Sequence, residues 1–138
     1  MLTIDASVWV SAADRTDALS LPSRHFLAGA LRRQLPIYLP SFAWLEIACA
    51  LTRQRRDAGR GQQLANLVLT SPFIVLIECD GSLLTQAQLL GAQAYLRAAD
   101  ALYVATATRH STALISWDRE LIQRAGAITP TDWFAANP

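Results

Sequence analysis

The sequence has no lysine and only two cysteines and two histidines among its 138 residues. The missing lysine excludes enzymes that depend on one, among them the P-loop nucleotide hydrolases, whose Gly-Lys-Ser/Thr motif is absent. The cysteines, Cys49 and Cys79, form no Cys-x-x-Cys pair, so we expect neither a disulfide framework nor a zinc site of the usual His/Cys spacing. Cys49 lies in an apolar helical pattern, where it is expected to be a small buried residue.

Long apolar runs are also missing, and none reaches the roughly 18–20 residues of a membrane span. The first residues contain no basic segment and carry Asp5 within an apolar stretch, so we expect no signal peptide and a cytoplasmic location. The formal net charge is only +1, which by itself says nothing about nucleic acid. All 12 basic residues are arginine, a good phosphate ligand, although a compositional bias of the source genome is the simpler explanation.

Hydrophobic residues make up 52% of the chain and charged residues 17%, which is enough apolar material for one folded domain over residues 1–138. Short apolar segments without alternation predict buried strands at 2–5, 37–39, 73–77 and 113–116. Helical patterns lie between them at 6–13, 22–34, from 42 onward, 62–69, 80–96, 98–110 and 118–125. We expect Ser41 to cap the third helix, residues 59–61 to break the chain, and residues 129–133 to form a tail after a last short strand at Ile128. The alternation predicts an α/β fold of three layers, with a central, mainly parallel sheet between helices.

Four of the 11 acidic residues stand in apolar surroundings. Asp5 ends the first predicted strand, Asp118 follows the last one, and Glu46 and Asp100 lie in apolar helical patterns. A carboxylate in such a place costs several kcal/mol unless it is paired or neutralised. No lysine is available and no arginine lies immediately beside Asp5, Glu46 or Asp100, so a divalent cation is the natural counter-charge. Because Asp5 and Asp118 both follow strands, they are expected at the carboxyl edge of the sheet, where α/β proteins bind ligands.

Each acid also has a structural explanation. Asp5 and Asp118 could simply cap the helices that follow them. Asp100 could offset the dipole of its helix, and Glu46 could lie on a solvated helix face. The set of four is more specific than any member, because carboxylates that converge repel one another unless a cation such as Mg²⁺ or Mn²⁺ binds between them.

Four segments resemble, in order and with suitable gaps, the VapC-type toxins of the PIN-domain family. They are Leu2-Thr-Ile-Asp5-Ala-Ser7-Val-Trp-Val10, Pro40-Ser-Phe-Ala-Trp-Leu-Glu46, Arg97-Ala-Ala-Asp100-Ala-Leu-Tyr-Val-Ala-Thr-Ala107 and Leu114-Ile-Ser-Trp-Asp118-Arg-Glu-Leu121. The third segment is the most specific, and the resemblance covers essentially the whole chain. One departure is Ser116, where the family often has threonine, but the hydroxyl is kept.

The resemblance implies a PIN α/β fold and a Mg²⁺-dependent (or Mn²⁺-dependent) endoribonuclease, the toxin of a bacterial type II toxin–antitoxin pair. It implies that Asp5, Asp100 and Asp118 are metal ligands, and that Glu46 completes the acid–base cluster. Ser7 and Ser116 would support the cluster by hydrogen bonds. The implied partners are an RNA substrate, a cognate antitoxin that masks the site, and a second copy in a homodimer.

Substrate contacts are less defined by the sequence. Arginines downstream of Glu46 could bind RNA phosphates, or could only form a solvated helix end: Arg53, Arg55, Arg56 and Arg60. Three tryptophans could stack on bases, although core positions are the commoner use of such residues: Trp9, Trp44 and Trp117. Trp9 and Trp44 could instead line a groove for the antitoxin.

Other functions fit the sequence less well. Phosphoryl transfer through an aspartate, as in haloacid-type phosphatases and receiver domains, needs a lysine, and the phosphatases need a second Asp where this chain has Ser7. A PIN-like module for binding RNA or protein without catalysis is the main alternative, and the presence of all four acids argues against it. A DNA-directed nuclease is a further one, although the short chain has no added elements for gripping DNA.

Overall fold

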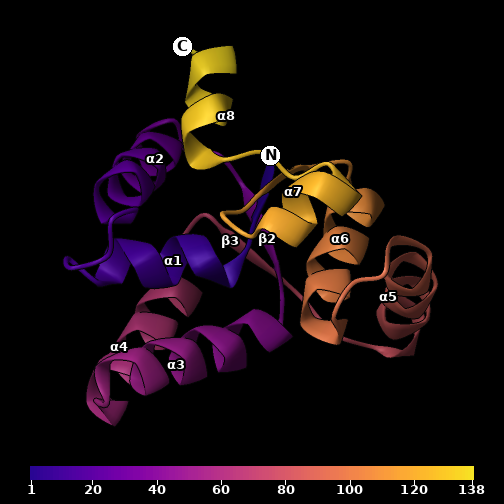
Figure 1. Ribbon diagram of the computed structural model, residues 1–138, viewed down its shortest axis with the longest axis horizontal. Helices are drawn as coiled ribbons and strands as arrows, with labels where there is room; N and C mark the ends of the chain where they lie inside the picture. Colours follow the sequence, from indigo (N-terminus) through magenta and orange to yellow (C-terminus); the bar gives the residue numbers. More distant parts are fainter.

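A computed structural model describes all 138 residues and places a four-stranded, fully parallel sheet at the centre (Figure 1). The strands are β1 (Leu2–Ile4), β2 (Ile37–Pro40), β3 (Ile74–Ile77) and β4 (Ala113–Ile115). Their order is β3-β2-β1-β4, and Leu2 lies beside Ile37 where β1 pairs with β2 and beside Ala113 where β1 pairs with β4. The predicted α/β class with a parallel sheet is confirmed.

The helices are α1 (Ala6–Ala13), α2 (Ser20–Arg32), α3 (Phe42–Arg55), α4 (Ala58–Leu69), α5 (Gly81–Ala94), α6 (Ala98–His110), α7 (Arg119–Ala125) and α8 (Pro130–Ala136). The chain moves one way along the sheet from β1 to β3 and then returns to β4. Because crossovers between parallel strands are right-handed, α1 to α4 lie on one side of the sheet and α5 with α6 on the other (Figure 1). This is the three-layer arrangement. None of these helices is both long enough and apolar enough to cross a lipid bilayer.

The core explains why the central strands lack alternation. Most residues of β1, β2 and β4 are buried whichever face they point to, because helices cover both faces, and Tyr38 and Ala113 are half-buried. Leu2, Ile4, Ile37, Leu39 and Ile115 are at most 1% exposed. The edge strand β3 differs, since its two middle residues, Val75 and Leu76, remain partly exposed.

The third helix begins where predicted, but its cap and its buried face differ from the prediction. Ser41 does not cap it; the Ser41 hydroxyl accepts a 3.1 Å hydrogen bond from the Cys79 amide instead. The buried face consists of Ala43, Ile47 and Leu51. Cys49 therefore points outward and is exposed, so the prediction of a buried Cys49 is wrong.

The expected chain break at residues 59–61 is also wrong, because they form the first turn of α4. The break lies earlier, at Arg56, whose φ of 54° ends α3, and Asp57 then caps α4 by accepting from the Arg60 amide. Gly61 is needed for packing rather than for a turn. A Cβ at this position would lie 2.4 Å from the Ala48 carbonyl oxygen, so only glycine lets α3 and α4 approach this closely.

The C-terminal segment is a helix where the sequence suggested a tail. Thr129 caps α8, and Trp133 packs edge-on against Phe26 of α2 with ring centroids 5.6 Å apart. Ile128 forms only an isolated bridge to Ile115 rather than a strand. Residues 128–136 therefore close the core beside β4 and α2.

Candidate active site

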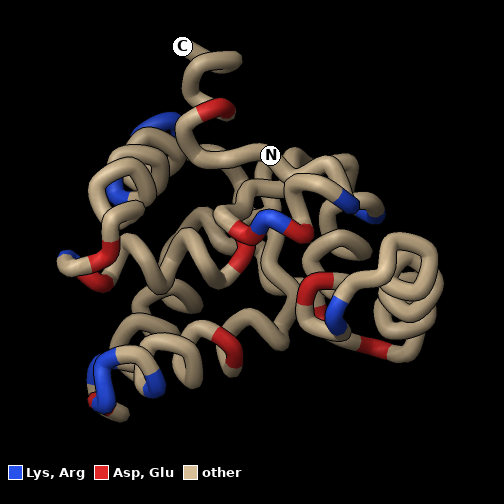
Figure 2. The backbone as a smooth tube through the Cα atoms, viewed as in Figure 1, with Lys and Arg blue, Asp and Glu red and all other residues tan.

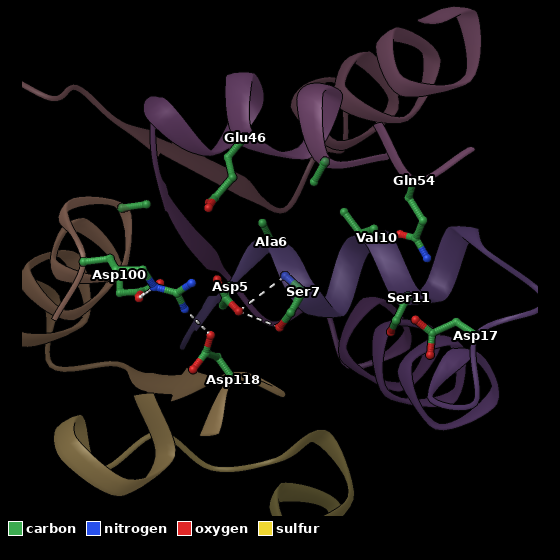
Figure 3. A pocket seen from close by; sticks show the side chains of 13 residues that line it. Asp5, Ala6, Ser7, Val10, Ser11, Asp17, Glu46, Gln54, Asp100 and Asp118 are labelled. Atoms are coloured by element: carbon green, nitrogen blue, oxygen red, sulfur yellow. Dashed lines mark hydrogen bonds and ion pairs between the residues drawn. The ribbon is translucent and has the colours of Figure 1, made fainter. Parts of the chain in front are cut away.

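The four acids singled out from the sequence line one cavity of about 440 Å³. The cavity opens beyond the carboxyl ends of β1 and β4, where the strand order reverses and ligands bind in open α/β sheets. Asp5, Glu46, Asp100 and Asp118 gather at one end of the cavity, and Asp17 and Gln54 lie at the other (Figure 3). Folding thus brings together carboxylates that are as much as 113 residues apart.

Asp5 lies at the bottom of this cluster and is only 4% exposed. It follows β1 and caps α1, and its Oδ2 accepts hydrogen bonds from the Ser7 amide at 3.3 Å, the Ser7 hydroxyl at 2.5 Å and the Ser116 hydroxyl at 2.7 Å. Its Oδ1 accepts none. Burial raises the pKa of Asp5, and the hydrogen bonds from Ser7 and Ser116 only partly oppose this rise.

Both serine hydroxyls are held in place from the opposite side. The Ser7 hydroxyl accepts from the Trp117 amide at 3.1 Å, and the Ser116 hydroxyl accepts from the Asp118 amide at 2.9 Å. Their hydrogens are therefore directed at Asp5. The turn between β4 and α7 is tied in this way to the end of β1, so Ser7 and Ser116 have the geometry expected of supporting residues.

Glu46 approaches from α3 on the other side of the cavity. Its Oε2 accepts a 2.7 Å hydrogen bond from the hydroxyl of Tyr103, which is fully buried in α6. Burial raises the pKa of Glu46, the Tyr103 hydrogen bond lowers it, and the nearby charges of Asp5 and Asp100 raise it further. Tyr103 was missed by sequence reasoning, although its position three residues after Asp100 places both on one face of the helix.

Asp100 and Asp118 complete the cluster. Asp100, in the first turn of α6, is 6% exposed, and burial is the main reason why its pKa is raised. Asp118 caps α7 by accepting from the Glu120 amide at 2.7 Å. The cap roles weighed for Asp5 and Asp118 are therefore real, and they coexist with a place in the cavity.

An arginine also belongs to the cluster, which corrects the expectation that none accompanies these acids. Arg97 donates from Nε to Asp100 Oδ2 at 2.9 Å and from Nη2 to Asp118 Oδ2 at 2.6 Å. Its side chain is 67% exposed, so it spans the mouth of the cavity from the solvent side. The contact with Asp100 was visible as a three-residue spacing at a helix start, whereas the contact with Asp118 arises only from folding.

The donor set fits a hard divalent cation such as Mg²⁺, because it consists of carboxylate oxygens. Burial, and to a smaller extent the neighbouring negative charges, raise the pKa of Asp5, Glu46 and Asp100. The geometry is not preformed, since no group of three or more His, Cys, Asp or Glu side chains already stands in a metal-holding arrangement. Asp5, Asp100 and Asp118 remain the predicted ligands.

The four arginines proposed to contact RNA do not line the cavity. Basic residues gather where α3 ends and α4 begins (Figure 2). They are Arg53, Arg55, Arg56 and Arg60. Arg55 is paired with Asp14 at 3.3 Å, and Asp14 is a buried residue directly after α1. A role of these arginines in RNA binding stays a prediction.

Comparison with solved structures shows the same fold in several proteins. VapC20 from Mycobacterium tuberculosis, a toxin that cleaves the sarcin–ricin loop, aligns with a TM-score of 0.79 at 17% identity over 93% of this chain and 97% of its own. A protein named PAE2754 from Pyrobaculum aerophilum aligns with a TM-score of 0.72 at 19% identity, over 98% and 87%. FitAcB from Neisseria gonorrhoeae gives 0.70 at 16% identity, over 95% and 99%.

In sequence, no curated protein matches the chain. The profile of the PIN domain family does match it, over residues 2–127. This match includes all four acids, both supporting serines and every strand of the sheet. The chain therefore belongs to the PIN domain family.

Proposed function

We propose that this protein is a metal-dependent endoribonuclease that acts as the toxin of a type II toxin–antitoxin pair. The observation that carries the proposal is the convergence of Asp5, Glu46, Asp100 and Asp118 on one cavity. Each arrives from a different element of the fold. Perturbed pKa values cluster at functional sites, so the raised pKa of three of these acids supports a functional site over isolated helix caps.

A divalent cation held by Asp5, Asp100 and Asp118 would offset their repulsion and stabilise the charge that develops on a scissile phosphodiester. Glu46 would accept the proton of the attacking water, since a carboxylate with a raised pKa is a better base. Tyr103 holds Oε2 of Glu46, which leaves Oε1 for this task. Ser7 and Ser116 would keep Asp5 from rotating.

An antitoxin partner is supported by an apolar groove, which is lined by other residues of α1 than those that line the acidic cavity. The groove has a volume of about 590 Å³ and lies between α1, α2 and α4, with Trp9, Leu27, Leu31, Leu64 and Leu67 among its lining residues. Trp9 thus lines the groove while Trp44, 47% exposed, lies elsewhere on α3. Related folds occur in a toxin–antitoxin complex from Klebsiella pneumoniae and in VapBC2 from Rickettsia felis bound to promoter DNA.

A homodimer is proposed as well. The edge strand β3 presents its unpaired backbone and two partly exposed apolar side chains, Val75 and Leu76. Such an edge is normally covered in soluble proteins. A second copy would cover it, and sedimentation equilibrium of the purified chain measures the assembly directly.

Cleavage of end-labelled RNA by the purified chain tests the catalytic proposal. We expect cleavage with Mg²⁺ or Mn²⁺, none with EDTA, and none with Asp5→Asn or Asp100→Asn. Asp57→Asn is the matched control, because Asp57 caps α4 outside the cavity. Cleavage that survives EDTA or Asp5→Asn contradicts the proposal. A folded wild-type protein that binds RNA and cuts none would instead be a binding module.

A further inference from the structure

Arg97 holds the two carboxylates that the proposed function assigns to the metal. Its guanidinium uses two different nitrogens, with 2.9 Å from Nε to Asp100 and 2.6 Å from Nη2 to Asp118. Both contacts end on an Oδ2 atom, so one planar group joins the start of α6 to the start of α7. A third acid, Glu120, lies 3.9 Å from Nε and adds to the attraction.

The other two acids of the cavity are held differently. Asp5 is bound by serine hydroxyls and Glu46 by Tyr103, and neither makes a hydrogen bond or an ion pair with Arg97. The arginine therefore pairs with one half of the cluster, while Asp5 and Glu46 have no contacting cation. This division matches the lack of any preformed group of metal-holding side chains.

Resting on the proposed function, we propose that Arg97 is a resident counter-ion that competes with the divalent cation for Asp100 and Asp118 and leaves them when the cation binds. A guanidinium and a metal ion cannot share the same carboxylate oxygens without strong like-charge repulsion. The exit is open, because the Arg97 side chain is 67% exposed and extends from the end of a helix rather than from the core. Metal affinity is then set partly by this arginine.

Calorimetric titration of Mn²⁺ into the full chain tests the competition. Arg97→Ala is expected to tighten Mn²⁺ binding by about three- to tenfold, since it removes two ion pairs that binding must otherwise break. Arg97→Lys keeps the charge but loses the two-nitrogen fork, so its affinity is expected between those of the wild type and Arg97→Ala. Arg124→Ala is the matched control: Arg124 contacts Glu120 and the Tyr95 carbonyl outside the cavity, and its loss leaves the affinity unchanged.

Unchanged or weaker Mn²⁺ binding by Arg97→Ala overturns the proposal and makes Arg97 a support for the ligands. If Asp5→Asn binds Mn²⁺ as the wild type does, the proposed metal site itself is wrong, which is a different result. Tighter binding by Arg97→Ala that disappears on adding Asp5→Asn supports both.

A second measurement uses the unaltered chain. The arginine Nε–H signals are followed by NMR during a Mg²⁺ titration, with Arg97 assigned as the signal missing from Arg97→Lys. The Arg97 signal is expected to shift or broaden as the cation binds, while that of Arg55, which pairs with Asp14, stays in place. A stationary Arg97 signal in protein that binds Mg²⁺ contradicts the displacement.

Discussion

Tyr103 reaches from α6 across the cavity to Glu46 on α3 and donates a 2.7 Å hydrogen bond to its carboxylate. This bond is the main influence that lowers the pKa of Glu46 against the effect of burial. Tyr103 thus acts on the proposed chemistry through Glu46, as a positioning residue.

Tyr103→Phe tests that role. Without the hydroxyl the pKa of Glu46 rises further, so the acidic limb of the pH–rate profile is expected to move to higher pH. The KM for RNA is expected to stay the same, because the buried ring does not contact substrate. Kinetics of RNA cleavage from about pH 5 to 8 measure the shift, and an unmoved acidic limb with a lower rate at every pH would mean that Tyr103 is only structural.

Asp5→Asn removes the negative charge of this side chain and keeps its size. The amide oxygen can still accept from Ser7 and Ser116, so the fold is expected to survive while metal-dependent cleavage is lost. Removing a buried negative charge among other acids is expected to leave the melting temperature in EDTA unchanged or higher. A clear drop in that melting temperature would show that the charge of Asp5 stabilises the fold.

Stability in EDTA is expected to fall as pH rises above the ordinary carboxyl range near pH 4. Asp5, Glu46 and Asp100 have a pKa raised above the unfolded value, so the native state binds more protons above that range, and its advantage is lost as pH rises through the folded pKa values. Asp14, whose pKa is lowered chiefly by Thr16, acts oppositely but only below its ordinary value near pH 4. Thermal melts in EDTA at increasing pH measure the slope.

Glu46→Gln tests how much Glu46 contributes to the pH dependence of the melting temperature in EDTA. One of the three raised groups is then gone, and the dependence of melting temperature on pH is expected to be flatter than in the wild type. Saturating Mn²⁺ is expected to flatten it as well. Identical slopes for Glu46→Gln and wild type would mean that Glu46 titrates alike in the folded and unfolded states.

Ser116→Ala removes a fully buried hydroxyl that donates to Asp5 and accepts from the Asp118 amide. Leaving such groups unpaired costs about 1–3 kcal/mol in the free energy of unfolding, and we expect slower cleavage as Asp5 loosens. Ser20→Ala is a matched control, because the buried Ser20 hydroxyl has no partner and its loss is expected to cost little. Urea unfolding of both variants makes the comparison, and equal losses would refute this account.

Gly61→Ala is expected to destabilise the protein by about 1–3 kcal/mol, because the new methyl group meets the Ala48 carbonyl at the α3–α4 contact. Helix propensity alone predicts the opposite sign. Gly59→Ala in the same turn has only an ordinary 3.4 Å contact and is expected to be neutral or slightly stabilising. Urea unfolding decides between helix propensity and steric contact as the dominant effect. A gain in stability at both positions would contradict the close packing of α3 and α4 at Gly61.

The sequence predicted helices and strands correctly where their bounds depend on a local pattern of residues. Helix α6 begins and ends where predicted, and each of the four strands differs from prediction by a single residue at one end, because apolar runs bounded by polar or turn-forming residues are local signals. Gly61 was misread, since its role depends on the Ala48 carbonyl in another helix. For the same reason α8 was missed, because it is held by packing on Phe26.

In the candidate site, too, the sequence predicted some residues and not others. Acids in apolar surroundings stand out in the sequence, since burying a carboxylate without a partner is costly. The partners do not stand out. Nothing in the sequence pairs Tyr103 with Glu46, or Arg97 with Asp118 at a separation of 21 residues, because side-chain contacts between elements follow from how the helices pack.

The two oxygens of Asp5 differ in their hydrogen bonds, and this difference affects which ion the protein would select. With Oδ2 saturated by three donors, only Oδ1 is left to offer a cation. A small octahedral ion such as Mg²⁺ keeps several waters and binds few carboxylate oxygens, whereas calcium takes roughly six to eight oxygen ligands and can take both oxygens of one carboxylate. Discrimination against calcium would then begin with two serines that never touch the ion.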